Sequence, residues 1–291
     1  LKDKKVIFSW NALMCQAFLD GSAATGDRDL LQKAIINIKS LLKLTDRYGE
    51  VFRSWKDGKF SGYGFLEDYA NFINVLTRAH GLTSDPVYLK EAVKLADTMV
   101  SKFWDNTDQV FYDTPHTGEN LIYRPSEYYD NAVPSGASAA CLALRDLSII
   151  FNISKYTDIY KSLLNSIYPD ACQHPTAFGN WMCGLADDLR DIVEVAIVGS
   201  TNDNIDKLRS IVLKTYLPNS VLICDATDEY LDNDRSQLMS SPLLKGRSGQ
   251  ENAATAYICK DYACELPVSN RETLIEILDG ILIKGNGLES N

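Results

Sequence analysis

The part of the chain between residues 9 and 168 repeats one pattern, in which apolar residues recur every three to four positions. Such segments lie at 9–24, 27–42, 64–80, 85–104, 134–147 and 155–168. Segments that are apolar on nearly every side alternate with segments that have a single apolar face. The alternation predicts buried inner helices and one-sided outer helices, paired as helical hairpins. A seventh helix near 175–190 would begin a fourth hairpin.

The connections between these helices alternate in length. "TGD", "GLTSD" and "FNIS" are short links, whereas residues 43–63 and 105–133 form long ones. Short links therefore gather at one end of the assembly and long links at the other, where a functional site is expected. The pattern predicts a mainly α fold, in which residues 1–190 form an incomplete α/α toroid of helical hairpins.

The periodicity changes after Ile192 to short β-branched runs. "VEVAIVGS" (193–200), "SVLICD" (220–225) and "TAYIC" (255–259) are typical of strands, and helices are expected near 202–216 and 270–282. We expect the three strands to share one sheet, in a small C-terminal α/β unit that covers residues 191–291. Its "VGSTND" turn lacks the glycines of a phosphate-binding fingerprint, which favours a structural unit.

The helix predicted at 64–80 carries two adjacent carboxylates in its first turn. Glu67 falls on the polar side with Asn71, Asn74 and Arg78, which is interpreted as a solvent-exposed face. Asp68 lies in line with the apolar residues, so we expect it to face the interior near the end with the long links, close to Trp10 and Asp130. A carboxylate in that position is costly unless a partner binds it.

Composition excludes several classes of function. The net charge is −10 and basic residues do not cluster, which argues against a nucleic-acid partner. No apolar run reaches the roughly 20 residues of a membrane span. Seven cysteines, an odd number, are interpreted as reduced thiols, which favours a reduced intracellular compartment and an ordinary soluble protein. The chain begins at Leu1 without a signal peptide and is interpreted as a piece of a longer one.

Histidines and cysteines indicate neither a metal site nor a cofactor. The three histidines lack the spacing of metal ligands. Cys259 and Cys264, in "CKDYAC", are farther apart than the usual redox pair or metal clip, so structural thiols are favoured.

Residues that suit a polyhydroxylated ligand recur at the end with the long links. Aromatic rings can stack on sugar faces, and charged groups can bind hydroxyls. Asp68 and Asp130 are the candidate catalytic acid and base. The candidate substrate-binding residues are Trp10, Asn11, Arg53, Trp55, Glu67, Tyr69, Arg124, Tyr129 and Ser135. The alternative is that the aromatic residues fill the core, that Arg53 pairs with an acid to hold a loop, and that Asp68 caps backbone N–H groups.

Four motifs resemble those of one protein family in the same order. "DKKVIFSWNALM", "GFLEDYA", "YYDNAVPSGAS" and "ATAYICKDYAC" are similar to motifs of spermatogenesis-associated protein 20 and its bacterial relatives. The chain departs from the family pattern at Lys4, Ala12 and Ala137. The resemblance covers nearly the whole chain and implies the C-terminal portion of such a protein. It implies a toroid like that of six-hairpin glycosidases and N-acylglucosamine 2-epimerases, with a thioredoxin-like domain upstream.

Two functions remain open at this point. One is a carbohydrate-active enzyme, a hydrolase or isomerase of a sugar or glycan. The other is a non-catalytic module that binds carbohydrate or peptide and works with the upstream redox domain that the resemblance implies. Turnover of a bound glycan would favour the enzyme, whereas binding without turnover would favour the module.

Overall fold

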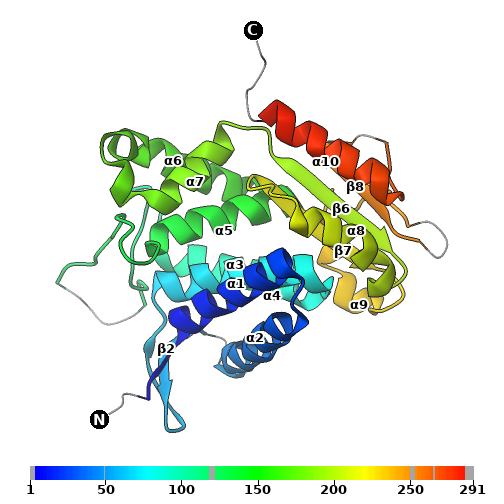
Figure 1. Ribbon diagram of the computed structural model, residues 1–291. Helices are drawn as coiled ribbons and strands as arrows, with labels where there is room; N and C mark the ends of the chain where they lie inside the picture. Colours follow the sequence, from blue (N-terminus) through cyan, green and yellow to red (C-terminus); the bar gives the residue numbers. More distant parts are fainter. Residues whose placement is uncertain (1–3, 49, 118–121, 250–252, 265, 286–291) are drawn as a thin grey trace.

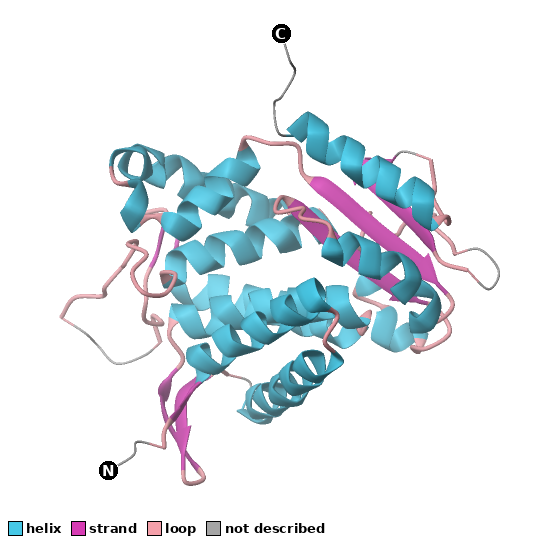
Figure 2. Cartoon of the chain, viewed as in Figure 1, coloured by secondary structure: helices cyan, strands magenta, loops and turns pink. Residues whose placement is uncertain are grey.

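The computed structural model describes residues 4–48, 50–117, 122–249, 253–264 and 266–285. Helical hairpins occupy one side of the molecule, and a sheet with its own helices occupies the other (Figures 1 and 2). Among the described residues, no helix combines the length and the apolar composition that a membrane span requires.

Three antiparallel hairpins form the helical part. They are α1 (Phe8–Thr25) with α2 (Arg28–Tyr48), α3 (Leu66–Thr83) with α4 (Pro86–Phe103), and α5 (Gly136–Phe151) with α6 (Ser154–Gln173). The inner helices pack side by side, α1 against α3 and α3 against α5. A short helix, α7 (Gly179–Asp188), follows and packs on α5 and α6. This arrangement is an incomplete α/α toroid, which confirms the predicted fold class.

Left-handed residues explain why the links after the inner helices are short. α1, α3 and α5 end at Gly26, Ser84 and Asn152, whose φ angles are 77°, 60° and 53°. A residue in this conformation closes the last helical turn and reverses the chain. The outer helix can then begin within a few residues, so the short links gather at one end of the toroid.

The long links contain strands that the sequence analysis did not predict. β2 (Phe52–Lys56) and β3 (Lys59–Tyr63) form a hairpin, and β1 (Val6–Ile7) extends it. Asp57 and Gly58 at its tip have φ angles of 48° and 80°, as a type I′ turn requires. A second small pair joins β4 (Trp104–Asp105) to β5 (Val110–Phe111).

The strands of the C-terminal part belong to one sheet, as predicted. Its order is β7 (Ser220–Ala226), β6 (Val193–Gly199), β8 (Thr255–Lys260) and β9 (Ala263–Cys264). β6 and β7 are parallel and are connected through α8 (Asn202–Lys214), whereas β8 runs antiparallel to β6. The remaining helices are α9 (Asp232–Arg235) and α10 (Arg271–Gly285). Figure 1 shows α8 and α10 on the same side of the sheet.

Each face of the sheet packs against a different hydrophobic core. Successive side chains of a strand point to opposite faces. Val195 and Ile197 of β6 accordingly lie in a core with α8 and α10, whereas Ala196 and Val198 lie in the core of the helical hairpins. The sheet is therefore packed directly onto the toroid. The division into domains at residues 190 and 191 stays a prediction.

Buried polar contacts join α3 to the sheet. Nε2 of His80 accepts a hydrogen bond from the backbone N–H of Cys224 in β7 at 3.2 Å, and its Nδ1 lies 3.0 Å from the carbonyl oxygen of Asp85. Burial lowers the pKa of His80 to about 4. Because its ring is neutral, Nδ1 carries the proton and donates it. Arg209 of α8 also donates to the Ser84 hydroxyl at 2.8 Å.

One prediction about the cysteines is wrong. Cys259 and Cys264 form a disulfide, because they face each other across the β8–β9 hairpin. The other five cysteines are free, and Cys172 and Cys183 are the exposed ones. The prediction failed because it judged the pair by its spacing in sequence, whereas a tight hairpin brings such positions together.

Candidate functional site

The mouth cluster lies where the long links enter the inner helices, and it consists of Ser9, Arg53, Glu67 and Asp68. Asp68 is fully buried and accepts hydrogen bonds from the backbone N–H groups of Ser9 at 2.9 Å and Phe65 at 2.8 Å. Nη1 of Arg53 lies 3.1 Å from the same carboxylate and also pairs with Glu67. The predicted burial of Asp68 is therefore correct, and its partner is Arg53.

Two opposing effects act on the Asp68 carboxyl. Burial raises its pKa to about 6, while the positive charge of Arg53 and the N–H group of Phe65 act to lower it. Glu67 adds a smaller repulsion that raises the pKa. Above pH 6 the carboxylate is ionised and its oxygens are held by backbone N–H groups and a guanidinium, which is the arrangement of a structural cap.

Asp130 caps two other helices. Its Oδ1 accepts from the N–H of Ser135 at 2.9 Å and the hydroxyl of Ser138 at 2.7 Å, at the start of α5. Its Oδ2 accepts from the N–H groups of Asn180 at 2.8 Å and Trp181 at 3.3 Å, in the first turn of α7. Four donors occupy the lone pairs of this carboxylate, so little of its hydrogen-bonding capacity is left for a ligand.

The two candidate carboxylates have separate sets of partners. Their helices meet closely, since a side chain on Gly136 in α5 would lie 3.0 Å from the backbone nitrogen of Glu67 in α3. Asp68 nevertheless binds Ser9, Arg53 and Phe65, while Asp130 binds residues of α5 and α7. An acid–base role for this pair stays a prediction.

The candidate aromatic residues divide into exposed and buried ones. Trp10 is 62% exposed, and Trp55 and Tyr129 are also exposed, so their rings are accessible to a ligand. Tyr69 is buried against Phe103, and its hydroxyl accepts from the backbone N–H of Val51 at 3.3 Å. Tyr69 therefore belongs to the core, as the alternative interpretation expected of the aromatic residues.

The remaining candidates make local contacts. The amide of Asn11 donates to the carbonyl of Ile7 at 2.8 Å, and the hydroxyl of Ser135 caps α5. Arg124 donates to the carbonyl of Thr114 at 2.6 Å and lies over the ring of Tyr112. These three residues stabilise helix ends and loops in the structure.

Asp113 is an acidic residue that the sequence analysis missed. It follows β5 and accepts from the N–H of Glu127 at 3.0 Å. Burial, with a smaller contribution from the charges of Glu127 and Glu67, raises its pKa to about 6, although the hydrogen bond from the N–H of Glu127 acts to lower it. No motif or helical phase in the sequence marks this position, because its surroundings come from a folded loop.

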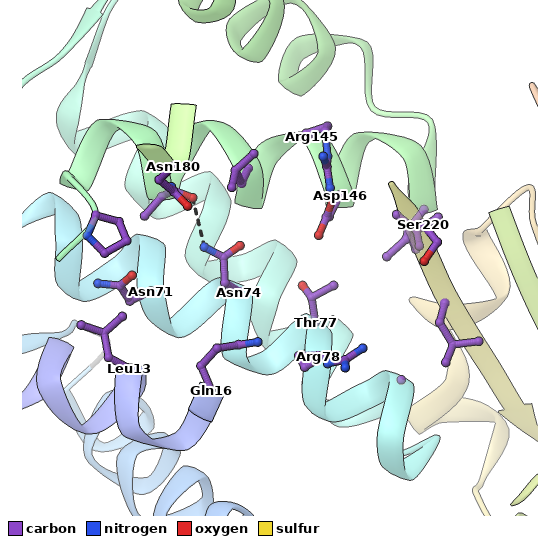
Figure 3. Close-up of a pocket in the computed structure, with 17 residues that line it drawn as sticks. Leu13, Gln16, Asn71, Asn74, Thr77, Arg78, Arg145, Asp146, Asn180 and Ser220 are labelled. Carbon is purple, nitrogen blue, oxygen red and sulfur yellow. Dashed lines mark hydrogen bonds and ion pairs between the residues drawn. The ribbon is translucent and has the colours of Figure 1, made fainter. Parts of the chain in front are cut away.

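A central cavity of about 320 Å³ lies between the inner helices and the sheet. α1 contributes Leu13 and Gln16, and α7 contributes Asn180. Asn74 and Thr77 on α3 face Asn180 and Asp146 across it (Figure 3). Ser220, Val221 and Leu222 of β7 line the end near the short links. Inner helices and sheet thus build the cavity together.

Neutral hydrogen-bonding groups dominate the polar lining of the cavity. They come from Gln16, Asn71, Asn74, Thr77, Asn180 and Ser220. Oε1 of Gln16 is buried without a partner. The amide nitrogen of Asn74 donates to the carbonyl of Ala139 at 3.1 Å, whereas the Asn71 amide makes no hydrogen bond within the described residues. Asp146 is the single carboxylate among the described lining residues, and Arg145 neutralises it at 2.7 Å. The cavity can therefore bind a polar, uncharged molecule.

The polar face of α3 was the signal for this cavity. Asn71, Asn74 and Arg78 follow each other at helical spacing, and the sequence analysis interpreted them as a solvent-exposed face. In the structure that face turns toward α1 and α5 across the cavity. Two asparagines on an inner helix would have been the better indication, because an outward polar face usually carries charged residues.

Comparison with known proteins gives relatives over almost the whole chain. The chain is 26% identical over 290 residues to human spermatogenesis-associated protein 20, and 27% identical over 291 residues to the mouse protein. It resembles spermatogenesis-associated protein 20. In both comparisons 95% of this chain is matched to 36% of the relative, so the chain spans about a third of the length of these relatives. The predicted resemblance to spermatogenesis-associated protein 20 is confirmed.

Further comparisons add distant matches. An uncharacterized protein of Caenorhabditis elegans is 23% identical over 292 residues, which cover 95% of this chain and 38% of that protein. A glycoside hydrolase family 76 mannosidase from Bacteroides thetaiotaomicron matches 97% of this chain with 72% of its own, at 13% identity and a TM-score of 0.47. No protein-family model matches the chain.

Proposed function

We propose that the central cavity binds a carbohydrate. The observation that carries the proposal is the set of neutral amide and hydroxyl groups that α1, α3, α7 and β7 contribute to the lining of one cavity. Ligand sites need a few such polar groups in convergent positions, and this cavity falls within their usual size range. Sugar hydroxyls both donate and accept hydrogen bonds, which matches side-chain amides that do the same.

The charges around the cavity favour a neutral ligand. Nε of Arg78 lies 2.8 Å from the carboxylate of Asp20, so its charge is compensated. Arg145 is paired with Asp146 and with Asp187. An anionic ligand would have to compete with these ion pairs, whereas a neutral polyhydroxylated molecule leaves them intact.

An exposed aromatic residue lies near the edge of the cavity. Trp10 precedes the cavity-lining Leu13 by three positions, and residues at this spacing lie side by side on a helix. Its indole is mostly exposed. Such a ring can stack against the apolar face of a sugar, so Trp10 supports the proposed carbohydrate ligand.

A glycan array tests the proposal. Arrays of mannose-, glucose- and N-acetylglucosamine-containing oligosaccharides should reveal binding, and titration calorimetry with the best oligosaccharide should give a one-to-one stoichiometry. Asn71→Leu should weaken binding at least about tenfold, because it removes an amide that the cavity holds free. Asn165→Leu, at an exposed position on α6, is the matched control.

Two outcomes would contradict the proposal. One is the absence of binding to every oligosaccharide on the array. The other is equal binding by the Asn71→Leu and Asn165→Leu variants, which would place the ligand outside the central cavity.

Turnover of a carbohydrate that extends from the central cavity to the end with the long links is a second candidate, favoured by Asp113, which lies outside the cavity lining beside the start of α3. A carboxyl with a pKa near 6, beside Glu127 and Glu67, has the properties of a general acid. The expected result is product release from the bound oligosaccharide that Asp113→Asn abolishes while binding persists. Binding without product release would leave a carbohydrate-binding module. The upstream thioredoxin-like domain that the resemblance implies stays a prediction.

A further inference from the structure

The disulfide between Cys259 and Cys264 bridges a tight hairpin at the edge of the sheet. The two-residue turn consists of Asp261 and Tyr262, whose φ angles are 50° and 62°, as in a type I′ turn. Cys264 is exposed, whereas Cys259 is 4% exposed. Cys264 is therefore the more exposed residue of the pair.

A guanidinium group lies against both sulfurs. Nη2 of Arg247 is 2.6 Å from Sγ of Cys264 and 3.2 Å from Sγ of Cys259. Arg247 lies over the ring of Tyr257 at 5.3 Å, and its other nitrogen, Nη1, donates to the carbonyl of Leu243. These contacts fix the guanidinium in place. A disulfide gains little from a cation, whereas a thiolate in the same position is strongly stabilised.

Contacts other than the disulfide also hold this hairpin. The backbone N–H of Tyr262 donates to Glu194 at 2.9 Å, and its hydroxyl donates to the carbonyl of Ile149 at 3.0 Å. β8 and β9 also pair through their backbones. A cross-link that closes so short a loop removes little entropy from the unfolded chain, because that contribution grows with loop length. Stability therefore accounts for little of the role of this bond.

We propose that the Cys259–Cys264 disulfide is a redox-active site that exchanges with a dithiol, and that Arg247 holds the thiolate formed on reduction. This function is separate from carbohydrate binding, since the hairpin contributes no residue to the central cavity.

The exchange proceeds in two balanced steps. One thiol of the dithiol loses its proton to solvent and attacks Sγ of Cys264, the more exposed residue of the pair. The Cys259–Cys264 bond breaks, and its electron pair leaves with Cys259 as a thiolate that Arg247 binds. The second thiol of the dithiol then loses its proton and attacks the first sulfur of the dithiol, which is bonded to Cys264 in the mixed disulfide. This attack releases Cys264 as a thiolate. Two electrons pass to the protein, and the dithiol becomes a disulfide.

A second cavity gives the reducing molecule space beside the hairpin. It measures about 600 Å³, and Cys259, Lys260 and Ala263 line one side of it. Leu217 of the α8–β7 connection and Ile281 of α10 line other parts. A dithiol or an extended peptide segment that carries one can therefore approach the hairpin along an existing depression.

Redox titration tests the proposal. The parent protein and its variants carry Cys172→Ser and Cys183→Ser to remove the exposed free thiols. They are equilibrated in dithiothreitol buffers of stepped redox ratio, and alkylation with mass spectrometry counts the reduced cysteines. Reduction of Cys259 and Cys264 is expected with unchanged circular dichroism. Arg247→Met should shift the equilibrium toward the disulfide by roughly tenfold, the value of a hydrogen bond to a charged group.

Matched variants separate this role from a structural one. Lys245→Met removes an exposed cation two residues away and should leave the equilibrium unchanged. Arg247→Lys keeps the positive charge, so its equilibrium should shift toward the disulfide less than that of Arg247→Met. With glutathione disulfide as the oxidant, the free thiol of Cys259→Ser should form a mixed disulfide at Cys264 and release one reduced glutathione at least about tenfold faster than Cys264→Ser does at the buried Cys259.

Three results would overturn the proposal. The first is reduction of the disulfide only under conditions that unfold the protein. The second is an Arg247→Met equilibrium identical to that of Lys245→Met. The third is equal rates of glutathione capture by the Cys259→Ser and Cys264→Ser variants.

Discussion

The mouth cluster and the central cavity use polar residues of the same helix in opposite ways. In the mouth cluster, the charged groups of Arg53, Glu67 and Asp68 bind one another and the backbone. One turn farther along α3, Asn71 lines the cavity and its amide makes no hydrogen bond within the described residues. In this comparison the charged groups hold the structure, whereas the proposed carbohydrate site is lined mainly by neutral polar groups.

Desolvation explains the contrast. A buried charge is stable only with a partner, so Asp68 must be bound internally whatever else the site does. A neutral amide without a partner has a smaller desolvation penalty than a charge, so it can line a cavity and remain available to a ligand. Substitutions in the two regions should therefore separate stability from binding.

The largest effect is expected from Asp68→Asn. The substitution leaves Arg53 without its buried partner and should lower the free energy of unfolding by about 3 kcal/mol, while oligosaccharide binding stays unchanged. Chemical denaturation at pH 7.5 measures the first quantity, and calorimetry measures the second. Glu50→Gln, which breaks the ion pair with Lys102 nearer the surface, is the control. Lost binding at unchanged stability would reverse the assignment and make Asp68 a site residue.

His80, at the other end of α3, should make the joint with the sheet sensitive to acid. Its pKa is lowered from 6.5 to about 4. Between these pH values His80 is therefore protonated in the unfolded chain but neutral in the folded chain. Stability from this group is therefore complete above pH 6.5 and is lost as the pH falls to 4, by about 3 kcal/mol.

His80→Gln should remove that slope from the pH dependence of unfolding, and His116→Gln, at an exposed position, should keep it. Asp68 and Asp113 have raised pKa values near 6, and their contributions run in the opposite direction in this window. Both are present in every variant, so the difference between curves isolates His80. Parallel curves for the parent and His80→Gln would contradict the prediction.

Asn71→Leu should affect the cavity alone. We expect oligosaccharide affinity to fall at least about tenfold, while the free energy of unfolding changes by less than about 1 kcal/mol, because an unpaired buried amide is replaced by an apolar group of similar size. Denaturation and calorimetry on the same sample give both values. A large loss of stability would show that the amide has a structural partner.

The smallest effect is expected from Glu67→Gln in the mouth cluster. The side chains of Arg53 and Glu67 are 27% and 26% exposed, and partly solvated ion pairs contribute at most about 1 kcal/mol. Thermal melting should show a minor shift beside that of Asp68→Asn. Equal shifts for the two variants would mean that burial does not distinguish the two carboxylates.

The sequence predicted the helices well because each inner and outer helix has its own periodicity. It also placed Asp68 on the buried side of α3, since helical phase fixes direction. Helical phase could not predict which residue pairs with Asp68. Arg53 reaches Asp68 because β2 and β3 form a hairpin. The Asp57–Gly58 pair in "KDGK" was a signal for that hairpin that the analysis overlooked.

The cavity and the disulfide were beyond what local pattern could show. Asn71 and Asn74 have the spacing of a solvent-exposed face, and only the packing of α1, α5 and β7 around them turns that face inward. Cys259 and Cys264 meet through a two-residue turn with φ above zero at Asp261 and Tyr262, which are not glycines. Both features depend on contacts between elements far apart in the chain or on an unusual turn.

Strand β7 lines the cavity with Ser220, Val221 and Leu222. Ligand binding in the cavity should therefore affect how cooperatively the toroid and the sheet unfold. A ligand that touches both the helices and β7 favours the state in which they are docked, by mass action. Local opening of the sheet should then become rarer, and hydrogen exchange at β6 and β7 should slow along with that of α3. An occupied cavity would in this way make the toroid and the sheet unfold as one unit.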